Sequence, residues 1–217
     1  MKKIAVILSG CGVYDGSEIH EATLTLLNIS SNGASYQCAS ISGAQSRVMD
    51  HSVKQEMRET RDIIVEAARI ARGEIVDISN ISPKDYDAVI FPGGHGAALN
   101  LCDFGRNGGE GTKVNPAVEK LIKEFHAAKK PIGAICIAPV VVARVLAAHK
   151  VKVTIGNDPA TASAINKWGA EHVNCAAEEI CFDPGNLVVT TPAYMLARDI
   201  ASLNRGVEKL VKKILSL

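Results

Sequence analysis

Short apolar runs alternate with amphipathic stretches along this chain of 217 residues. Apolar runs bounded by glycine or proline predict strands buried on both faces, and apolar residues at every third or fourth position predict helices. The strands are expected at 3–9, 35–39, 87–91, 131–135 and 151–155. The helices are expected at 17–32, 57–72, 116–128, from the end of the fourth strand to 148, and at 161–168, followed by a hairpin over 180–191 and a helical segment over 194–217.

Strands that alternate with helices at this spacing predict an α/β fold, a doubly wound and mostly parallel sheet with helices on both faces. We expect residues 1–217 to form one domain, with Ser17 as the N-cap of the first helix. Residues 41–56 are polar and irregular, and 105–111 form a glycine-rich loop. Such sheets bind ligands beyond the carboxyl ends of their strands, where residues 10–11, 93–94 and 136 are expected to emerge together.

Composition excludes several classes of function. The net charge is +1 and the basic residues are scattered, so we expect no binding of nucleic acid or of membranes, and no apolar run approaches the ~18 residues of a membrane span. No cluster of histidine, cysteine and acidic residues has metal-ligand spacing, so neither a metal nor another cofactor is expected. The six cysteines form no CxxC pair, which is typical of reduced thiols and predicts a cytoplasmic protein.

Cys136 is the main candidate for chemistry. It ends the apolar run at 131–135 and is followed at once by helix-forming sequence, with Ala134 and Ala138 as small neighbours two positions away on either side. This pattern predicts a nucleophile elbow, in which a sharp strand-to-helix turn exposes the sulfur to the N-terminal N–H groups of a helix. Those groups are expected to hold the thiol pKa below its free value of about 8.5. The alternative is a buried cysteine that packs as a small apolar side chain.

Attack by a thiolate on a carbonyl also requires donors for the developing oxyanion. The backbone N–H of Ile137, which follows the cysteine, and that of Gly94, in the glycine turn after another strand, are suitably placed for this role. The glycine turn on its own is equally compatible with a plain strand ending.

The group that moves protons is left open by the residues alone. Glu18 and Glu21 lie one turn apart on the first helix, where they either reach the thiol or only complement the helix dipole. His20 points to another side of the helix, and His95, which follows Gly94, can reach the rim of a pocket. Cys11 is expected near Cys136, either as a second redox-active thiol or as an inert packed one.

Four segments resemble the ElbB-type proteins, the isoprenoid biosynthesis glyoxalases or enhancing-lycopene-biosynthesis proteins of bacteria. They cover residues 9–22, 91–94, 133–139 and 190–195. That family lies in the PfpI-like branch of the class I glutamine amidotransferase-like superfamily. The resemblance implies a flavodoxin-like α/β fold and a homodimer.

The resemblance also implies roles for individual residues. A glutamate on the first helix contacts the reactive cysteine in the superfamily, which places that role on Glu21, with Glu18 second. The oxyanion-binding positions correspond to Gly94 and Ile137. Relatives with a Cys–His pair or a Cys–His–acid triad carry histidine where this chain has Ile137 and Gly156, so the chain departs from the amidotransferase and peptidase pattern.

The activity implied by the resemblance is that of a cofactor-free glyoxalase, a lyase that converts glyoxal or methylglyoxal into a hydroxy acid. Cys136 adds to an aldehyde carbon, Glu21 shuttles protons through an enediol, and water releases the product. Two alternatives remain. One is a redox-sensing or scaffold protein in which Cys136 is oxidised and catalysis is negligible. The other is an amidotransferase-like subunit that acts with a partner protein.

Overall fold

The structure is a computed structural model, and it describes residues 1–109 and 111–217. The strands are β1 (Lys3–Leu8), β2 (Ser35–Ser40), β3 (Met49–Asp50), β4 (Gln55–Glu56), β5 (Ile75–Asp77), β6 (Ala88–Phe91), β7 (Ile132–Ile135), β8 (Lys152–Val153), β9 (Glu171–His172), β10 (Cys181–Asp183) and β11 (Val188–Thr191). The α-helices are α1 (Ile19–Ser31), α2 (Ile63–Ile70), α3 (His95–Leu99), α4 (Phe104–Asn107), α5 (Pro116–Ala127), α6 (Pro139–Leu146), α7 (Pro159–Lys167) and α8 (Ile200–Ser216). Short 3-10 turns lie at Ile78–Asn80, Ala147–His149 and Ala193–Met195.

Seven strands form the central sheet in the order β10-β11-β7-β6-β1-β2-β5. Every neighbouring pair is parallel except the edge hairpin of β10 and β11. In the middle of the sheet Val6 of β1 lies opposite Cys38 of β2 on one side and Ile90 of β6 on the other. The predicted doubly wound, mostly parallel α/β fold is confirmed.

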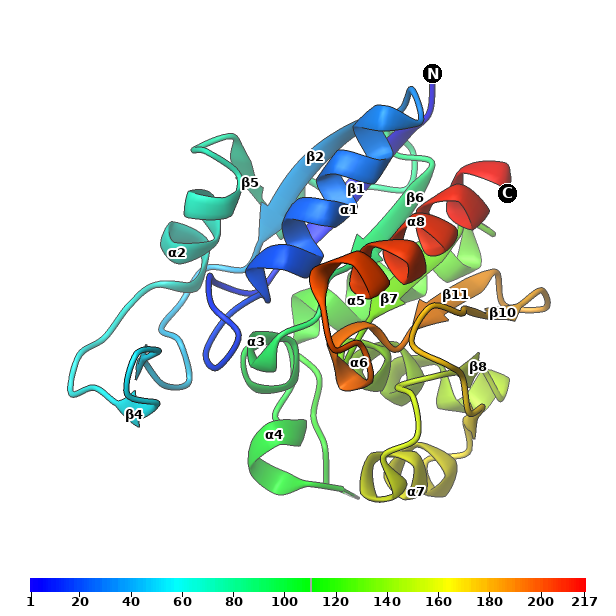
Figure 1. Cartoon of the computed structure of the whole chain (residues 1–217). Helices are drawn as coiled ribbons and strands as arrows, with labels where there is room; N and C mark the ends of the chain where they lie inside the picture. The colour runs from blue at the N-terminus through cyan, green and yellow to red at the C-terminus, as the bar shows by residue number, and fades with distance from the viewer. Residues whose placement is uncertain (110) are drawn as a thin grey trace.

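Helices cover both faces of this sheet, as Figure 1 shows. The blue α1 and the red α8 lie side by side over one face, and α5 and α6 cover the other. Each face has its own hydrophobic core: Ile29 and Leu210 belong to one, and Phe125 and Val141 to the other. Burying a Leu, Ile or Phe side chain contributes roughly 1.5–3 kcal/mol, so these two layers hold the sheet rigid behind the site. No helix among the described residues is both long enough and apolar enough to cross a membrane.

Two predicted helix starts are wrong because the capping residue differs. Glu18, rather than Ser17, is the N-cap of α1, since its side chain accepts a hydrogen bond from the Glu21 N–H. Helix α2 begins at Ile63 instead of residue 57, because the Asp62 side chain accepts hydrogen bonds from the N–H groups of Ile64 and Val65.

Other differences concern short elements. Strand β5 and helix α3 were not expected, and the segment 41–56 contains the small hairpin that β3 forms with β4. The loop expected at 105–111 partly belongs to α4, and its residue 110 lies outside the described residues. The strand expected at 151–155 is reduced to β8, which pairs with β9 and lies outside the central sheet. The C-terminal helical segment is split, because α8 begins only after its N-cap Asp199. Apart from α8, these elements have 2 to 5 residues and are too short for periodicity to reveal them.

Candidate active site

Cys136 lies in a sharp turn between β7 and α6. Its backbone has φ 62°, a conformation rare for a residue with a Cβ, and its N–H donates to the Thr191 carbonyl oxygen at 2.9 Å. A non-glycine residue held in this strained conformation at a strand-to-helix turn is typical of a nucleophile elbow. The strand, turn and helix expected around this cysteine are therefore present.

Glu21 of α1 reaches the same point from the other side of the sheet edge. Its carboxylate is fully buried, with Oε2 accepting from the Gly93 N–H at 3.0 Å and Oε1 from the Tyr194 N–H at 3.3 Å. The thiol of Cys136 lies close enough to this carboxylate to affect its pKa. A Cβ built on Gly93 would lie 2.5 Å from both Cys136 Cβ and Glu21 Oε2, so only glycine allows the cysteine and the glutamate to approach this closely.

Burial dominates the electrostatics of this pair. It raises the pKa of Glu21 to about 8, with a further contribution from the nearby Glu18 carboxylate. It also raises the pKa of the Cys136 thiol well above its ordinary value, and the Glu21 carboxylate adds to this increase. The predicted low thiol pKa is therefore wrong, because desolvation and a neighbouring carboxylate outweigh the N-terminal N–H groups. The thiol and the carboxyl group are close enough to share a proton.

Two backbone donors face the sulfur. The N–H groups of Gly94 and Ile137 lie close enough to the Cys136 sulfur to lower its pKa. Neither N–H donates to another backbone carbonyl in the turns and loops of the described residues. They converge on the sulfur from two strand ends, since Gly94 follows β6 and Ile137 follows β7. Two free donors beside a nucleophile form a site that can stabilise an oxyanion.

Glu18 does not join this group, and the charged neighbours of Cys11 are different ones. Glu18 Oε2 accepts from the Glu21 N–H at 2.7 Å, so this side chain caps α1 and acts on the thiol only through its charge on Glu21. The charged groups that shift the pKa of Cys11 are Glu66, Arg69 and Asp15, and burial raises that pKa. Cys11 follows β1, which β6 separates from β7, and its proximity to Cys136 stays a prediction.

Gly156 is, with Ile137, one of the two positions at which some relatives carry a histidine. It has φ 96°, and a Cβ there would lie 2.9 Å from the Leu196 side chain, so a histidine cannot occupy this place without rearrangement. His20 instead hydrogen-bonds through Nδ1 to the Tyr194 hydroxyl at 2.8 Å, beside the glutamate but on the exposed side of α1. The structure thus places a carboxyl group, rather than an imidazole, against the thiol.

A cavity of about 320 Å³ opens next to the elbow. It is lined by Arg47, His95, Ala98, Leu99, Phe104, Gly105 and Ile137. Ile137 joins it to the elbow, since this residue directly follows Cys136 and supplies one of the two free N–H groups. His95, expected at a pocket rim, lies in its wall. The volume is ample for a molecule of a few heavy atoms.

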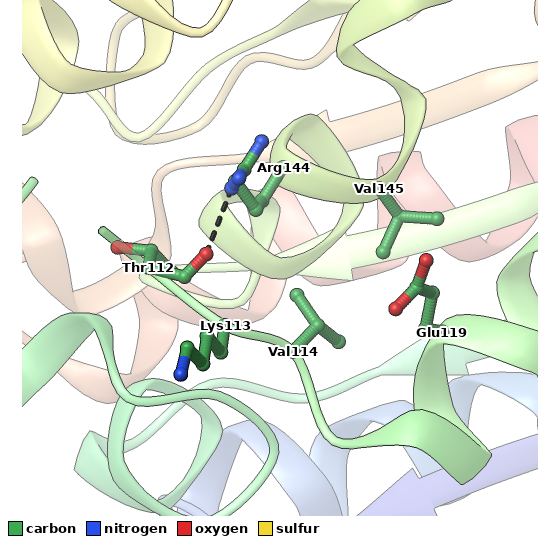
Figure 2. Close-up of a pocket in the computed structure, with 6 residues that line it drawn as sticks. All are labelled: Thr112, Lys113, Val114, Glu119, Arg144 and Val145. Atoms are coloured by element: carbon green, nitrogen blue, oxygen red, sulfur yellow. Dashed lines mark hydrogen bonds between the residues drawn. The ribbon is translucent and has the colours of Figure 1, made fainter. Parts of the chain in front are cut away.

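A second cavity, of about 380 Å³, is shown in Figure 2. It lies between α5 and α6, where Arg144 Nε donates to the Thr112 carbonyl oxygen at 2.8 Å, and Lys113, Val114, Glu119 and Val145 complete its lining. None of its lining residues contacts the thiol pair. Among the described residues, no three histidine, cysteine or acidic side chains gather in a way that can hold a metal ion.

Three groups at the site were not singled out from the sequence for the parts they play. They are the N–H of Gly93, the N–H of Tyr194 and the carbonyl of Thr191, which anchor the glutamate and the cysteine. All three are backbone groups, which leave no side-chain signature. The glycine turn after β6 and the two threonines that end β11 were the only available signals.

Comparison with known proteins places this geometry in context. A model of the DJ-1/PfpI family matches residues 2–198. The chain is 44% identical over 225 aligned positions to glutamine amidotransferase-like class 1 domain-containing protein 3, mitochondrial, of Homo sapiens, covering 99% of this chain and 83% of that protein. It is 35% identical to ES1 protein, mitochondrial, of Danio rerio, covering 99% of this chain and 85% of that protein.

A solved structure supports the same assignment. The isoprenoid biosynthesis protein with an amidotransferase-like domain from Ehrlichia chaffeensis is 36% identical, covers 99% of both chains and superimposes with a TM-score of 0.91. The class I glutamine amidotransferase-like fold implied by the resemblance is thus confirmed.

The expected cytoplasmic location is contradicted by these relatives. The proteins from Homo sapiens, Rattus norvegicus and Danio rerio all carry the word mitochondrial in their names. The prediction rested on reduced cysteines, and a reducing environment is not confined to the cytosol, so thiol chemistry cannot separate the two locations.

Proposed function

This chain belongs to the DJ-1/PfpI family, and from the contacts of its cysteine we propose that it is a cofactor-free glyoxalase of the ElbB type. Its substrate is glyoxal or methylglyoxal, which it isomerises and hydrates to a hydroxy acid. One observation carries the proposal: a thiol, a carboxyl group with a pKa of about 8 and two free backbone N–H groups converge at one point.

The first step is the addition of sulfur to the aldehyde. The Glu21 carboxylate takes the thiol proton as the Cys136 sulfur forms a bond to one carbonyl carbon. The N–H groups of Gly94 and Ile137 stabilise the oxyanion that develops there, and Glu21 returns its proton to that oxygen. A general base works best when its pKa lies near the working pH, so the raised pKa of Glu21 compensates for a thiol that is not ionised beforehand.

The second step moves a proton between the two carbons. The Glu21 carboxylate removes the hydrogen from the carbon bonded to sulfur, which gives an enediol, and reprotonation at the adjacent carbon gives a 2-hydroxy thioester. One carbon is oxidised from aldehyde to thioester while its neighbour is reduced from aldehyde to alcohol, so no external oxidant is required. Water then cleaves the carbon–sulfur bond, releasing glycolate from glyoxal and restoring the thiol.

The alternatives fit the site less well. Oxidation of a cysteine proceeds through its thiolate, and burial beside a carboxylate disfavours that form at Cys136, which argues against a redox sensor. Amide hydrolysis requires an acid to protonate the leaving amine, which is usually histidine. The groups that act on the Cys136 thiol are Glu21, Gly94 and Ile137, and none of them is a histidine. Isomerisation of a dicarbonyl has no leaving amine to protonate.

The test is an assay with glyoxal in the absence of glutathione. We expect the folded chain to form glycolate at a rate proportional to its concentration, as followed by NMR, and to release no ammonia from glutamine. A parallel sample unfolded by heat provides the background. Glycolate formation at the background rate, or only after glutathione is added, would contradict the proposal, and ammonia release would favour the amidotransferase alternative.

A further inference from the structure

We propose that His95 is a substrate-binding residue, whose Nε2–H donates to the oxygen on the substrate carbon next to the one attacked by Cys136. This inference rests on the proposed function, because it assigns the second oxygen of the dicarbonyl to a named group. The two oxygens of such a substrate lie on neighbouring carbons. The N–H groups of Gly94 and Ile137 account for one of them, and a donor for the other has to lie in the adjoining cavity.

The position of His95 follows from its neighbours in the chain. It directly follows Gly94, whose N–H faces the sulfur, and its own N–H donates to the Val13 carbonyl oxygen at 2.8 Å. Its side chain lines the same cavity as Ile137. His95 is therefore next to both backbone donors, because it follows Gly94 in the chain and lines the same cavity as Ile137.

Arg47 determines which ring nitrogen of His95 carries the proton. The Arg47 guanidinium donates twice to the Tyr14 carbonyl oxygen, at 3.0 Å from Nε and 2.8 Å from Nη2, which fixes its plane. The same Nη2 lies 3.0 Å from His95 Nδ1. Arginine has no acceptor, so Nδ1 has to be the acceptor of this hydrogen bond and the ring hydrogen has to be on Nε2.

The ring is also kept neutral. Partial desolvation and the positive charge of Arg47 lower the pKa of His95, whose side chain is still exposed in part, because an imidazolium would place a second cation and an N–H against the guanidinium. The Tyr14 ring packs edge-on against the imidazole, with the ring centroids 5.9 Å apart, and limits its rotation. A neutral imidazole N–H can polarise a carbonyl oxygen without giving up its proton. The charge on Arg47 polarises the ring further and strengthens this donor when the oxygen becomes an enediolate.

A set of matched variants tests this assignment. Phenylalanine keeps an aromatic ring but has no donor, and glutamine keeps an N–H at a similar reach. We expect kcat/KM for glyoxal to fall about 100-fold in His95→Phe, the loss typical of removing one oxyanion donor. We expect His95→Gln to retain most of the activity. An unchanged rate in His95→Phe would overturn the inference while leaving the proposed function intact.

A measurement that does not depend on activity completes the test. In ¹⁵N NMR of the full chain at neutral pH, His95 is expected as the neutral form with hydrogen on Nε2, and Arg47→Met is expected to raise its pKa. Glycolate, the hydroxy acid product, is expected to shift the Nε2 resonance. A hydrogen on Nδ1, or no shift with saturating glycolate, would overturn the inference. If the wild type does not convert glyoxal, the proposed function fails, and the glycolate titration alone decides the role of His95.

Discussion

Replacing Cys136 with alanine is expected to reduce glyoxal turnover by roughly 10⁴-fold or more, to the rate without protein, because loss of a nucleophile leaves only weak binding effects. The position of the sulfur is fixed by a backbone whose Cys136 N–H donates to the Thr191 carbonyl oxygen. The measurement is glycolate formation by NMR with and without the variant.

The matched control is Cys181→Ala. Cys181 is also buried, but it lies in the edge strand β10, two strands away from β7. It is expected to keep the wild-type rate, which separates loss of the nucleophile from a general loss of packing. Undiminished turnover in Cys136→Ala would reject the proposed mechanism.

Alkylation of Cys136 in the wild type is expected to require a higher pH than alkylation of a free thiol, because burial and Glu21 raise the pKa of Cys136.

Replacing Glu21 with glutamine is expected to lower kcat about 10²–10⁴-fold, the usual range for removing a general acid–base group. Glutamine has the same shape but cannot take a proton from the thiol or from carbon. In the wild type, kcat/KM is expected to rise with pH and to level off above about 8, where Glu21 is ionised. The dependence of kcat/KM on pH is expected to lose this rise in Glu21→Gln. If the variant kept both the wild-type rate and the rise with pH, Glu21 would be excluded as the base.

The same substitution has an effect on stability that does not depend on substrate. The pKa of Glu21 is raised from an ordinary 4.5 to about 8 in the folded chain, so the folded state holds a proton that the unfolded state has lost between these values. The free energy of unfolding therefore decreases as pH rises from about 4.5 to 8. Urea unfolding at pH 5 and pH 8 is expected to show a smaller decrease for Glu21→Gln. An equal decrease in both proteins would contradict the burial of an ionisable group at this position.

Local patterns in the sequence were enough for most of the fold. The runs at 3–8 and 132–135 are apolar on both faces, and the stripe along α1 ends at Asn32 before a glycine, so each element is defined by residues close together in the chain. Short elements, which have no repeated pattern of apolar residues, were not predicted. Strand β5 has 3 residues and forms because it pairs with β2 at the edge of the sheet. Helix α3 has 5 residues and begins directly after the glycine turn, with Gly94 as its N-cap.

The features of the site also divide into those that local sequence predicts and those that depend on the tertiary structure. An elbow at Cys136 and a glycine turn at Gly93 and Gly94 are local features, and the sequence by itself determined that the cysteine and the backbone donors would emerge at one edge of a parallel sheet. The residues alone left open whether Glu21 or Glu18 meets the thiol, and the tertiary structure places Glu21 there and makes Glu18 the cap of α1. Only the tertiary structure decided that the thiol pKa is raised instead of lowered. The pKa depends on how completely water is excluded by segments far apart in the chain, such as α1, β7 and Tyr194, and no local pattern records that exclusion.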